Sequence, residues 1–118
     1  MKIAVVGSRQ CTAKDSVEYL IGSLAAKDPD TIIVSGGARG VDSWAAQATK
    51  RAGLRVEVYL ADWDTHGKAA GFIRNATIVE ESDKVVAFWD GVSRGTNDTI
   101  KKARSVGKLA RVFMVKPL

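Results

Sequence analysis

The sequence predicts an α/β fold, a three-layer αβα arrangement around a five-stranded parallel sheet. Strand-like and helix-like patterns alternate along all 118 residues, as in chains built from repeated βαβ units. The strand-like runs are almost continuously apolar, which is typical of parallel strands covered by helices on both faces. Because every connection is short and no linker interrupts the pattern, we expect a single domain over residues 1–118.

Five runs rich in Val and Ile are predicted to be buried strands. In chain order they are residues 3–6, 31–34, 56–60, 84–88 and 110–115. Apolar residues at helical spacing fill each interval between these strands. The first helix is expected to begin at a capping box formed by Thr12 and Asp15. It is expected to bury Val17, Leu20, Ile21, Leu24 and Ala25.

Three further helices follow the same spacing. The second is expected over residues 41–52 and to end at Gly53. The fourth is expected to begin at a Thr96 cap, to bury Val106 and to end at Gly107. The third, over residues 67–81, is expected to bury Phe72, Ile73 and Ala76.

The net charge of +5 is concentrated near the end of the chain. Residues 84–118 hold eight Lys or Arg side chains against two acids, Asp90 and Asp98. A basic segment can attract nucleic acid or a phosphate-bearing ligand, but no aromatic residues alternate with the basic ones as on single-strand binding surfaces. A solvated helix face also accounts for these charges. Nucleic acid is therefore a less favoured partner than a small phosphate-bearing ligand.

Composition indicates a cytoplasmic protein with no membrane partner. No apolar run reaches the length of a membrane span, and the apolar start ends at Gly7, too soon for a signal peptide. The single cysteine, Cys11, fits a reducing compartment. His66 has no second His or Cys at ligand spacing, so neither a metal site nor another cofactor is expected. A homo-oligomer is compatible with the small domain, but no feature fixes its number of subunits.

Glycine and polar residues gather where the predicted strands end. Gly7, Ser8 and Arg9 follow the first strand, and residues 35–40 follow the second. Residues 61–64 and 89–96 follow the third and fourth strands. Because ligands of doubly wound sheets bind beyond the carboxyl ends of the strands, we expect these segments to form one binding site.

The strongest motif is the run Ser35-Gly36-Gly37-Ala38-Arg39-Gly40 between the second strand and the second helix. Glycines let a ligand approach the backbone, the first amides of a helix attract an anion, and an arginine can add a charged hydrogen bond. A tight turn that needs glycine for packing alone is the other interpretation. Gly95 and Thr96 offer a second helix N-terminus. We expect this helix end and the loop at residues 35–40 to hold phosphate.

Arg74 and Asn75 are polar residues among apolar ones in the third predicted helix. Asn75 can bond to a loop backbone. Arg74 can bind the ligand, or it can tie the helix down by pairing with Glu80, Glu81 or Asp83.

Trp63, Trp89 and Asp62 also follow strands. The tryptophans are expected either to lie against a base or to pack at the rim of the sheet. Asp62 stands 22 residues after Gly40, near the spacing of a ribose-binding acid. An NAD enzyme is nevertheless disfavoured, because the first strand leads into Gly7-Ser8-Arg9 and not into Gly-x-Gly-x-x-Gly.

With these segments assembled, the chain resembles the SLOG superfamily and, within it, the YspA/YpsA-related group of small Rossmann-like proteins. The resemblance runs over nearly the whole length and rests on VVGSR, SGGARGVDSWAAQ, ADWDTHGKAAGFIRN and WDGVSRGTNDTI. It implies that a nucleotide or nucleotide-derived ligand binds at the strand ends. The residues that it marks are Gly7, Ser8, Arg9, Gly36, Gly37, Arg39, Gly40, Arg74, Asn75, Gly95 and Thr96. Ser35, Ala38, Asp42, Asp62 and Trp63 complete the predicted ligand site.

Two relatives within this superfamily imply different activities. The Lonely Guy phosphoribohydrolases carry Pro-Gly-Gly-x-Gly-Thr-x-x-Glu, in which the Glu is catalytic. Here Thr99 stands at the position of that Glu, and Asp98 is one residue away, about 100° around a helix. A binding module or sensor is therefore favoured over an N-glycosidic hydrolase, unless an acid such as Asp42, Asp62 or Glu80 substitutes. No catalytic residue is assigned.

The second relative is the DNA-processing protein A group, which binds single-stranded DNA. It shares a Ser-Gly-x-Ala-Arg-Gly-x-Asp loop and an Arg-Asn helix with this chain. The basic residues 84–118 suit that activity, whereas the small number of aromatic residues does not. Single-stranded nucleic acid is the second alternative.

Overall fold

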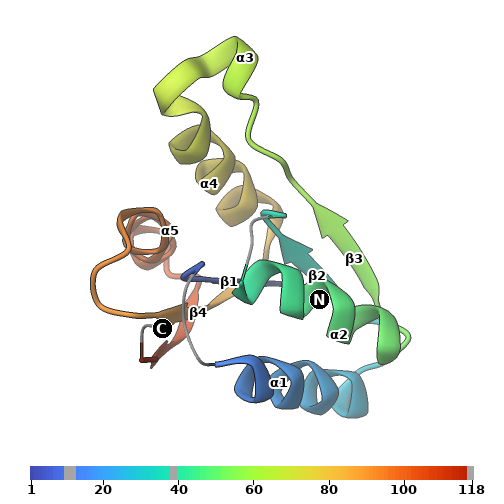
Figure 1. Cartoon of the computed structure of the whole chain (residues 1–118). Coiled ribbons are helices and arrows are strands. Elements are labelled where there is room, and N and C mark those ends of the chain that lie inside the picture. Colours follow the sequence, from blue (N-terminus) through green and yellow to red (C-terminus); the bar gives the residue numbers. More distant parts are fainter. Residues whose placement is uncertain (10–12, 38–39, 117–118) are drawn as a thin grey trace.

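The computed structural model describes residues 1–9, 13–37 and 40–116, which form a five-stranded sheet with helices on both faces (Figure 1). The strands are β1 (Lys2–Gly7), β2 (Ile32–Ser35), β3 (Arg55–Val58), β4 (Lys84–Trp89) and β5 (Leu109–Met114). They lie in the order β3-β2-β1-β4-β5, and every neighbouring pair is parallel. The predicted α/β, Rossmann-like fold is therefore confirmed.

Helices cover the sheet in two pairs. They are α1 (Lys14–Lys27), α2 (Val41–Arg51), α3 (Trp63–His66), the 3₁₀ turn η1 (Gly67–Ala69), α4 (Ala70–Glu81) and α5 (Arg94–Ser105). The pair α1 and α2 covers one face, α4 and α5 cover the other, and α3 stands beyond the end of β3 (Figure 1). Within the described ranges, none of these helices is long and apolar enough to cross a lipid bilayer.

Each face of the sheet has its own apolar core, because successive side chains of a strand point to opposite faces. Val5 of β1 packs into the core beneath α1 and α2, together with Ile21. Val6 packs into the core beneath α4 and α5, together with Ile78 and Ile100. The neighbouring strands β1, β2 and β4 are buried along most of their length. Their carboxyl ends are thereby held in a rigid frame.

The edge strands are less buried than predicted. β3 ends two residues earlier than expected, and Val58 at its end is about half exposed. β5 exposes Met114, although Phe113 stacks on Phe88 of β4 with ring centroids 4.9 Å apart. The prediction of five buried strands is wrong for these two, because each has a neighbouring strand on one side only.

The predicted inward face of the third helix is wrong for Phe72 and Ile73, which are both about half exposed. Phe72 instead lies beneath Lys102, whose Nζ is 5.5 Å from the ring centroid. The buried face of α4 carries Ala70, Asn75, Ile78 and Val79. An amide occupies an inward position of α4 because that position meets polar groups of α5, as described below.

Two predicted helix starts differ from the structure. Ala13 is the N-cap residue of α1, and Thr12 lies outside the described residues. Ser93 is the N-cap residue of α5. Thr96 is therefore a buried residue in the first turn of α5 and not its cap.

The predicted helix stops are correct. Gly53 and Gly107 follow the C-cap residues of α2 and α5 with φ of 76° and 72°, the left-handed conformation that favours glycine after a helix. Val106, which was expected to be buried, is exposed because it is itself the C-cap residue of α5.

Candidate functional site

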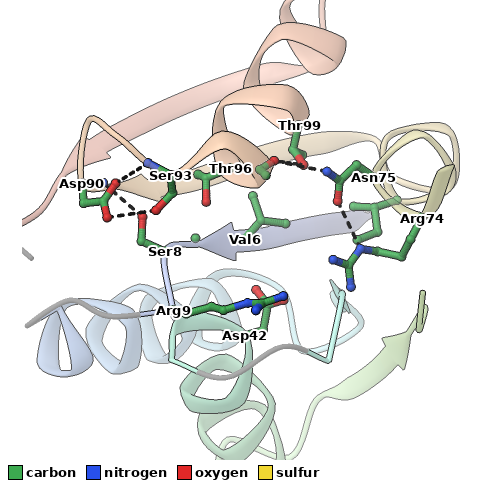
Figure 2. Close-up of a pocket in the computed structure, with 13 residues that line it drawn as sticks. Val6, Ser8, Arg9, Asp42, Arg74, Asn75, Asp90, Ser93, Thr96 and Thr99 are labelled. Atoms are coloured by element: carbon green, nitrogen blue, oxygen red, sulfur yellow. Dashed lines mark hydrogen bonds between the residues drawn. The ribbon is translucent and has the colours of Figure 1, made fainter. Parts of the chain in front are cut away.

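A cavity of about 440 Å³ lies beyond the carboxyl ends of β1 and β4 (Figure 2). We call it the main cavity. Its walls come from the segment after β1, from α2 and α4, and from the β4–α5 connection with the first turns of α5. Its lining residues are Val6, Gly7, Ser8, Arg9, Asp42, Arg74, Asn75, Ile78, Asp90, Ser93, Gly95, Thr96 and Thr99. The cavity has the size of a small-molecule site, and most of its lining residues have polar side chains.

Half of the residues predicted for the ligand site line the main cavity. They are Gly7, Ser8, Arg9, Asp42, Arg74, Asn75, Gly95 and Thr96. Ser35 is the last residue of β2, and Gly36, Gly37 and Gly40 belong to the β2–α2 connection, but none of them lines the main cavity. Ala38 and Arg39 lie outside the described residues.

Three polar lining residues were not singled out from the sequence as ligand residues: Asp90, Ser93 and Thr99. Asp90 and Ser93 belong to a segment that the sequence placed at a strand end, so their position was the available signal. Thr99 lies four residues after Gly95, a spacing that brings both to one face of a helix. That spacing could have identified it.

Arg74 reaches from α4 to the end of β2 and borders the main cavity (Figure 2). Its Nη1 donates a hydrogen bond to the carbonyl oxygen of Gly36 at 2.6 Å, and its Nε donates to Oδ1 of Asn75 at 3.1 Å. Burial lowers the pKa of Arg74, the carboxylate of Asp42 raises it, and Arg9 lowers it. The guanidinium is thus held in place by the protein, with Asp42 close enough to act on its charge.

Asn75 joins α4 to the first turn of α5. Its Nδ2 donates to the carbonyl oxygen of Gly95 at 3.2 Å and to Oδ2 of Asp98 at 3.1 Å. The backbone bond expected of Asn75 is therefore present, although it is made to a helix and not to a loop. Arg74 uses its bonds on Gly36 and Asn75 and not on the acids considered from the sequence, Glu80, Glu81 and Asp83.

The Gly36-Gly37 pair is required by close contacts within the protein. A Cβ on Gly36 would lie 2.8 Å from Nη1 of Arg74 and 3.0 Å from Oδ2 of Asp42. A Cβ on Gly37, where φ is 70°, would lie 2.6 Å from Cδ2 of Leu60. Any side chain at either position would therefore displace the residues around it.

The other predicted glycines divide into two kinds. A Cβ on Gly7 would lie 2.6 Å from the carbonyl oxygen of Phe88, and one on Gly40 would collide with the carbonyl oxygen of Arg9. Close packing explains both. Around Gly95, by contrast, no atom lies within 4 Å of a Cβ position. Among the described glycines of the predicted site, Gly95 is therefore the one with open space at its Cβ position.

Asp90 fixes the conformation of the β4–α5 connection. Its Oδ1 accepts hydrogen bonds from the amides of Val92 at 2.9 Å and Ser93 at 2.8 Å, and its Oδ2 accepts one from Oγ of Ser93 at 2.9 Å. The amide of Asp90 donates to Oγ of Ser8 at 3.1 Å. Burial acts to raise the pKa of Asp90, but the hydrogen bonds from Val92, Ser93 and Ser8 lower it overall. The ionised carboxylate thus links the segments after β1 and β4.

The N-terminal turn of α5 borders the main cavity. The side chain of the N-cap residue Ser93 makes no capping hydrogen bond, and the first turn contains no acidic residue. Just before the helix, the carboxylate of Asp90 accepts a hydrogen bond from the amide of Ser93. The first amides of a helix lack partners within the helix and carry a partial positive charge. Gly95 and Thr96 line the cavity together with two arginines and two carboxylates. The helix N-terminus, Arg9 and Arg74 favour an anion, whereas Asp42 and Asp90 oppose one.

A second cavity of about 260 Å³ shares Arg74 with the main cavity, and we call it the side cavity. It lies between the end of β3 and α4. Its lining residues are Val58, Tyr59, Leu60, Asp62, His66, Ala70, Ile73, Arg74 and Thr77. Asp62, one of the predicted site residues, therefore belongs to this cavity, where it also caps α3 by accepting a hydrogen bond from the amide of Thr65 at 3.2 Å.

Neither tryptophan lines either cavity. Trp63 is 54% exposed in α3. Trp89 packs against the core beneath α4 and α5, and its Nε1 donates to the carbonyl oxygen of Ser93 at 3.0 Å. The packing interpretation therefore fits Trp89.

The acidic residues near the site have separate environments. The carboxylate of Asp98 accepts a hydrogen bond from Asn75 and pairs with Lys102, whereas the neighbouring Thr99 lines the main cavity. Of the acids considered as substitutes for a catalytic Glu, Asp42 lines the main cavity, Asp62 lines the side cavity, and Glu80 lines neither. Among the described residues, no group of three His, Cys, Asp or Glu side chains could hold a metal ion.

Comparisons with known proteins find related sequences and similar folds. Residues 1–66 match the family described as the YspA, cpYpsA-related SLOG family. The Gene 61 protein of Mycobacterium phage D29 is 34% identical over 113 residues, and the match covers 90% of this chain and 90% of the phage protein.

Solved structures share the fold. DNA processing protein A (DprA) of Streptococcus pneumoniae matches 93% of this chain with a TM-score of 0.78 and 24% identity. DprA of Helicobacter pylori, solved to explain its single-stranded DNA binding mode, matches 94% with a TM-score of 0.70 and 23% identity. TM1055 matches 92% with a TM-score of 0.75 and 25% identity. The matches span 49% of the first of these chains, 64% of the second and 71% of the third.

Proposed function

This chain belongs to the YspA, cpYpsA-related SLOG family, and on that premise we propose that it binds a nucleotide or a nucleotide-derived ligand in the main cavity. The observation that carries the proposal is that Arg9, Arg74 and the first turn of α5 border one cavity. Arginine side chains and helix N-termini are common partners of phosphate in proteins. The phosphate is assigned to this wall.

The remaining lining suits a sugar. Hydroxyl groups of Ser8, Thr96 and Thr99 and the buried carboxylate of Asp42 face or border the same space. A carboxylate accepts hydrogen bonds from hydroxyl groups and repels phosphate. We therefore assign the ribose hydroxyls to Asp42 and the phosphate to the two arginines and the first turn of α5. The oxygens of Asp90, the other carboxylate of the lining, are already bonded to Val92 and Ser93.

We propose binding without cleavage of the N-glycosidic bond. A hydrolase of the Lonely Guy type needs its carboxylate at the position that Thr99 occupies here, and a threonine hydroxyl is not ionised. Asp98 is engaged by Asn75 and Lys102. Asp42 is the acid that could act instead, so the experiment must detect cleavage as well as binding.

The test is isothermal titration calorimetry with AMP, ribose 5-phosphate and ADP-ribose, with chromatography of each mixture for released base. The informative variant is Arg9→Ala, because Arg9 is exposed and its loss leaves the core intact. The matched control is Arg104→Ala, an exposed arginine in the last turn of α5. We expect Arg9→Ala to weaken binding about tenfold or more and Arg104→Ala to change it little.

Each other outcome has a definite meaning. Equal losses for Arg9→Ala and Arg104→Ala would show unspecific attraction and would contradict a phosphate site. Release of free base that depends on Asp42 would make the protein a hydrolase. Absence of binding by all three ligands would remove the nucleotide proposal.

Single-stranded nucleic acid is the second candidate ligand. The fold that this chain shares with the H. pylori DNA-binding protein supports it, as do the exposed basic residues Lys101, Arg104 and Arg111 on α5 and β5. A binder of this kind should prefer an oligonucleotide to AMP and should lose affinity steeply as salt rises. Titration of a fluorescent oligothymidylate at two salt concentrations separates this candidate from a mononucleotide site.

A further inference from the structure

The two cavities that meet at Arg74 differ in chemistry. The main cavity is lined mainly by charged and hydroxyl side chains, and none of its described lining residues is aromatic. The side cavity has an apolar wall formed by Val58, Tyr59, Leu60 and Ile73. A sugar phosphate suits the first lining, whereas a planar heteroaromatic ring gains more from apolar and aromatic contacts.

The glycine pair after β2 connects the two cavities. Gly36 is in close contact with Arg74 and Asp42, which line the main cavity. Gly37 is in close contact with Leu60 and Val58, which line the side cavity. Adjacent residues of one turn therefore each pack against lining residues of a different cavity, and Arg74 lines both cavities.

We infer that the side cavity is the subsite for the nucleobase, so that the bound nucleotide lies across Arg74 with its phosphate in the main cavity. The inference rests on the function proposed above and adds the location of the base. Arg74 suits this middle position because Gly36 and Asn75 hold its guanidinium in place before any ligand arrives. The ligand class is a nucleoside phosphate, and neither a free base nor a sugar phosphate fills both cavities.

Asp62 gives the side cavity a preference among bases. Its hydrogen bond with Thr65 lowers the pKa of its carboxyl group, which is therefore ionised at neutral pH. An ionised carboxylate only accepts hydrogen bonds, so it favours an exocyclic amino group and disfavours a carbonyl oxygen at the same place. We expect AMP, which has an amino group where IMP has a carbonyl oxygen, to bind more tightly than IMP. GMP should share this preference only if its amino group at C2 reaches Asp62.

The experiment compares ribose 5-phosphate with AMP, GMP and IMP by calorimetry in the wild type and in side-cavity variants. Ile73→Ala and Leu60→Ala remove wall contacts, and both side chains are exposed enough for the fold to tolerate their loss. Phe72→Ala is the matched control, because Phe72 neighbours Ile73 in α4, is similarly exposed, and lines neither cavity. Asp62→Asn keeps a side chain that can still cap α3 while removing the charge.

We expect Ile73→Ala and Leu60→Ala each to weaken AMP or GMP binding about fivefold and to leave ribose 5-phosphate unchanged. Phe72→Ala should change neither, and Asp62→Asn should abolish the preference over IMP. Two outcomes would overturn the base subsite and leave the phosphate site standing. In the first, ribose 5-phosphate binds as tightly as the nucleotides. In the second, the nucleotides bind more tightly, but both wall variants keep that added affinity. If neither sugar phosphate nor nucleotide binds, the proposed function fails, and the base subsite fails with it.

Discussion

Nη1 of Arg74 donates a hydrogen bond to the carbonyl oxygen of Gly36 at 2.6 Å, although 38 positions separate the two residues. This bond ties α4 to the end of β2. Because Nε of Arg74 is also bonded, to Asn75, the guanidinium has a fixed orientation at the cavity wall. Because the side chain of Arg74 is already ordered, a ligand loses less affinity to the entropy cost of restricting the rotamers of that arginine.

Arg74→Lys is expected to weaken both stability and binding although it keeps the charge. A lysine ammonium cannot reproduce the planar set of donors that reaches Gly36 and Asn75 together. We expect the free energy of unfolding to fall by about 1–2 kcal/mol and nucleotide affinity to fall about tenfold. Urea unfolding and calorimetry measure the two effects, with Arg104→Lys as control. Wild-type affinity in Arg74→Lys would show that charge alone matters.

Asn75→Asp tests the connection between α4 and α5. The change replaces a donor by a carboxylate beside the carbonyl oxygen of Gly95 and the carboxylate of Asp98. We expect a loss of about 2–4 kcal/mol in the free energy of unfolding, because two acceptors would face each other in a buried place. Urea denaturation is the measurement.

The double variant Asn75→Asp with Asp98→Asn is the control for that interaction. It exchanges donor and acceptor between the two positions, so the pair can bond again in the opposite direction. We expect it to recover part of the stability lost in Asn75→Asp. A double variant whose loss equals the sum of the two single losses would show that residues 75 and 98 do not interact.

Gly95→Ala is expected to separate stability from binding. Gly95 lies in the first turn of α5 with open space around it, so alanine should raise the free energy of unfolding by about 0.5 kcal/mol. The added methyl group would stand at the edge of the main cavity and lower nucleotide affinity severalfold. Thermal denaturation and calorimetry on the same samples check both changes.

Gly107→Ala is the matched control for Gly95→Ala. A Cβ on Gly107 also has open space, but its φ is 72° and it lies after α5, outside the cavity lining. We expect a loss of about 1 kcal/mol in stability and unchanged affinity. If Gly95→Ala bound nucleotides as tightly as the wild type, the ligand would not approach the first turn of α5.

The sheet could be predicted because each central strand and each helix end is marked by residues within a short stretch of sequence. Apolar runs identify the central strands β1, β2 and β4, and glycines identify the ends of α2 and α5. The alternation of elements then leads to the parallel sheet. Edge strands were less well predicted, because β3 and β5 are also rich in apolar residues and their exposure depends on strand order.

The candidate site was predicted in part, for a similar reason. Position after a strand identified Ser8, Arg9 and Gly95, and polar residues within an apolar helix identified Arg74 and Asn75. Their partners depend on tertiary structure and could not be derived. The burial of Phe72 and Ile73 was wrongly predicted because helical periodicity cannot distinguish an apolar face that packs on the sheet from one that stays exposed.

Asp90 is expected to make stability depend on pH in the acidic range. Its pKa in the folded protein is below the ordinary value of 3.8, because Val92, Ser93 and Ser8 donate hydrogen bonds to it against the effect of burial. The ionised form therefore stabilises the fold above about pH 4, and this contribution declines as pH falls through the lowered pKa. Urea unfolding from pH 7 to pH 2 should show the decline in the wild type and a smaller one in Asp90→Asn.

Ser93→Ala tests the cause of that shift without removing the titrating group. It deletes the hydroxyl that donates to Oδ2 of Asp90 at 2.9 Å and leaves the two backbone amides in place. The pKa of Asp90, followed by NMR of its carboxyl carbon, should rise partway toward 3.8. The acid-dependent loss of stability should then be smaller than in the wild type and should be complete at a higher pH. An unchanged pKa in Ser93→Ala would mean that the amides of Val92 and Ser93, and the Ser8 hydroxyl, are sufficient to hold Asp90 ionised.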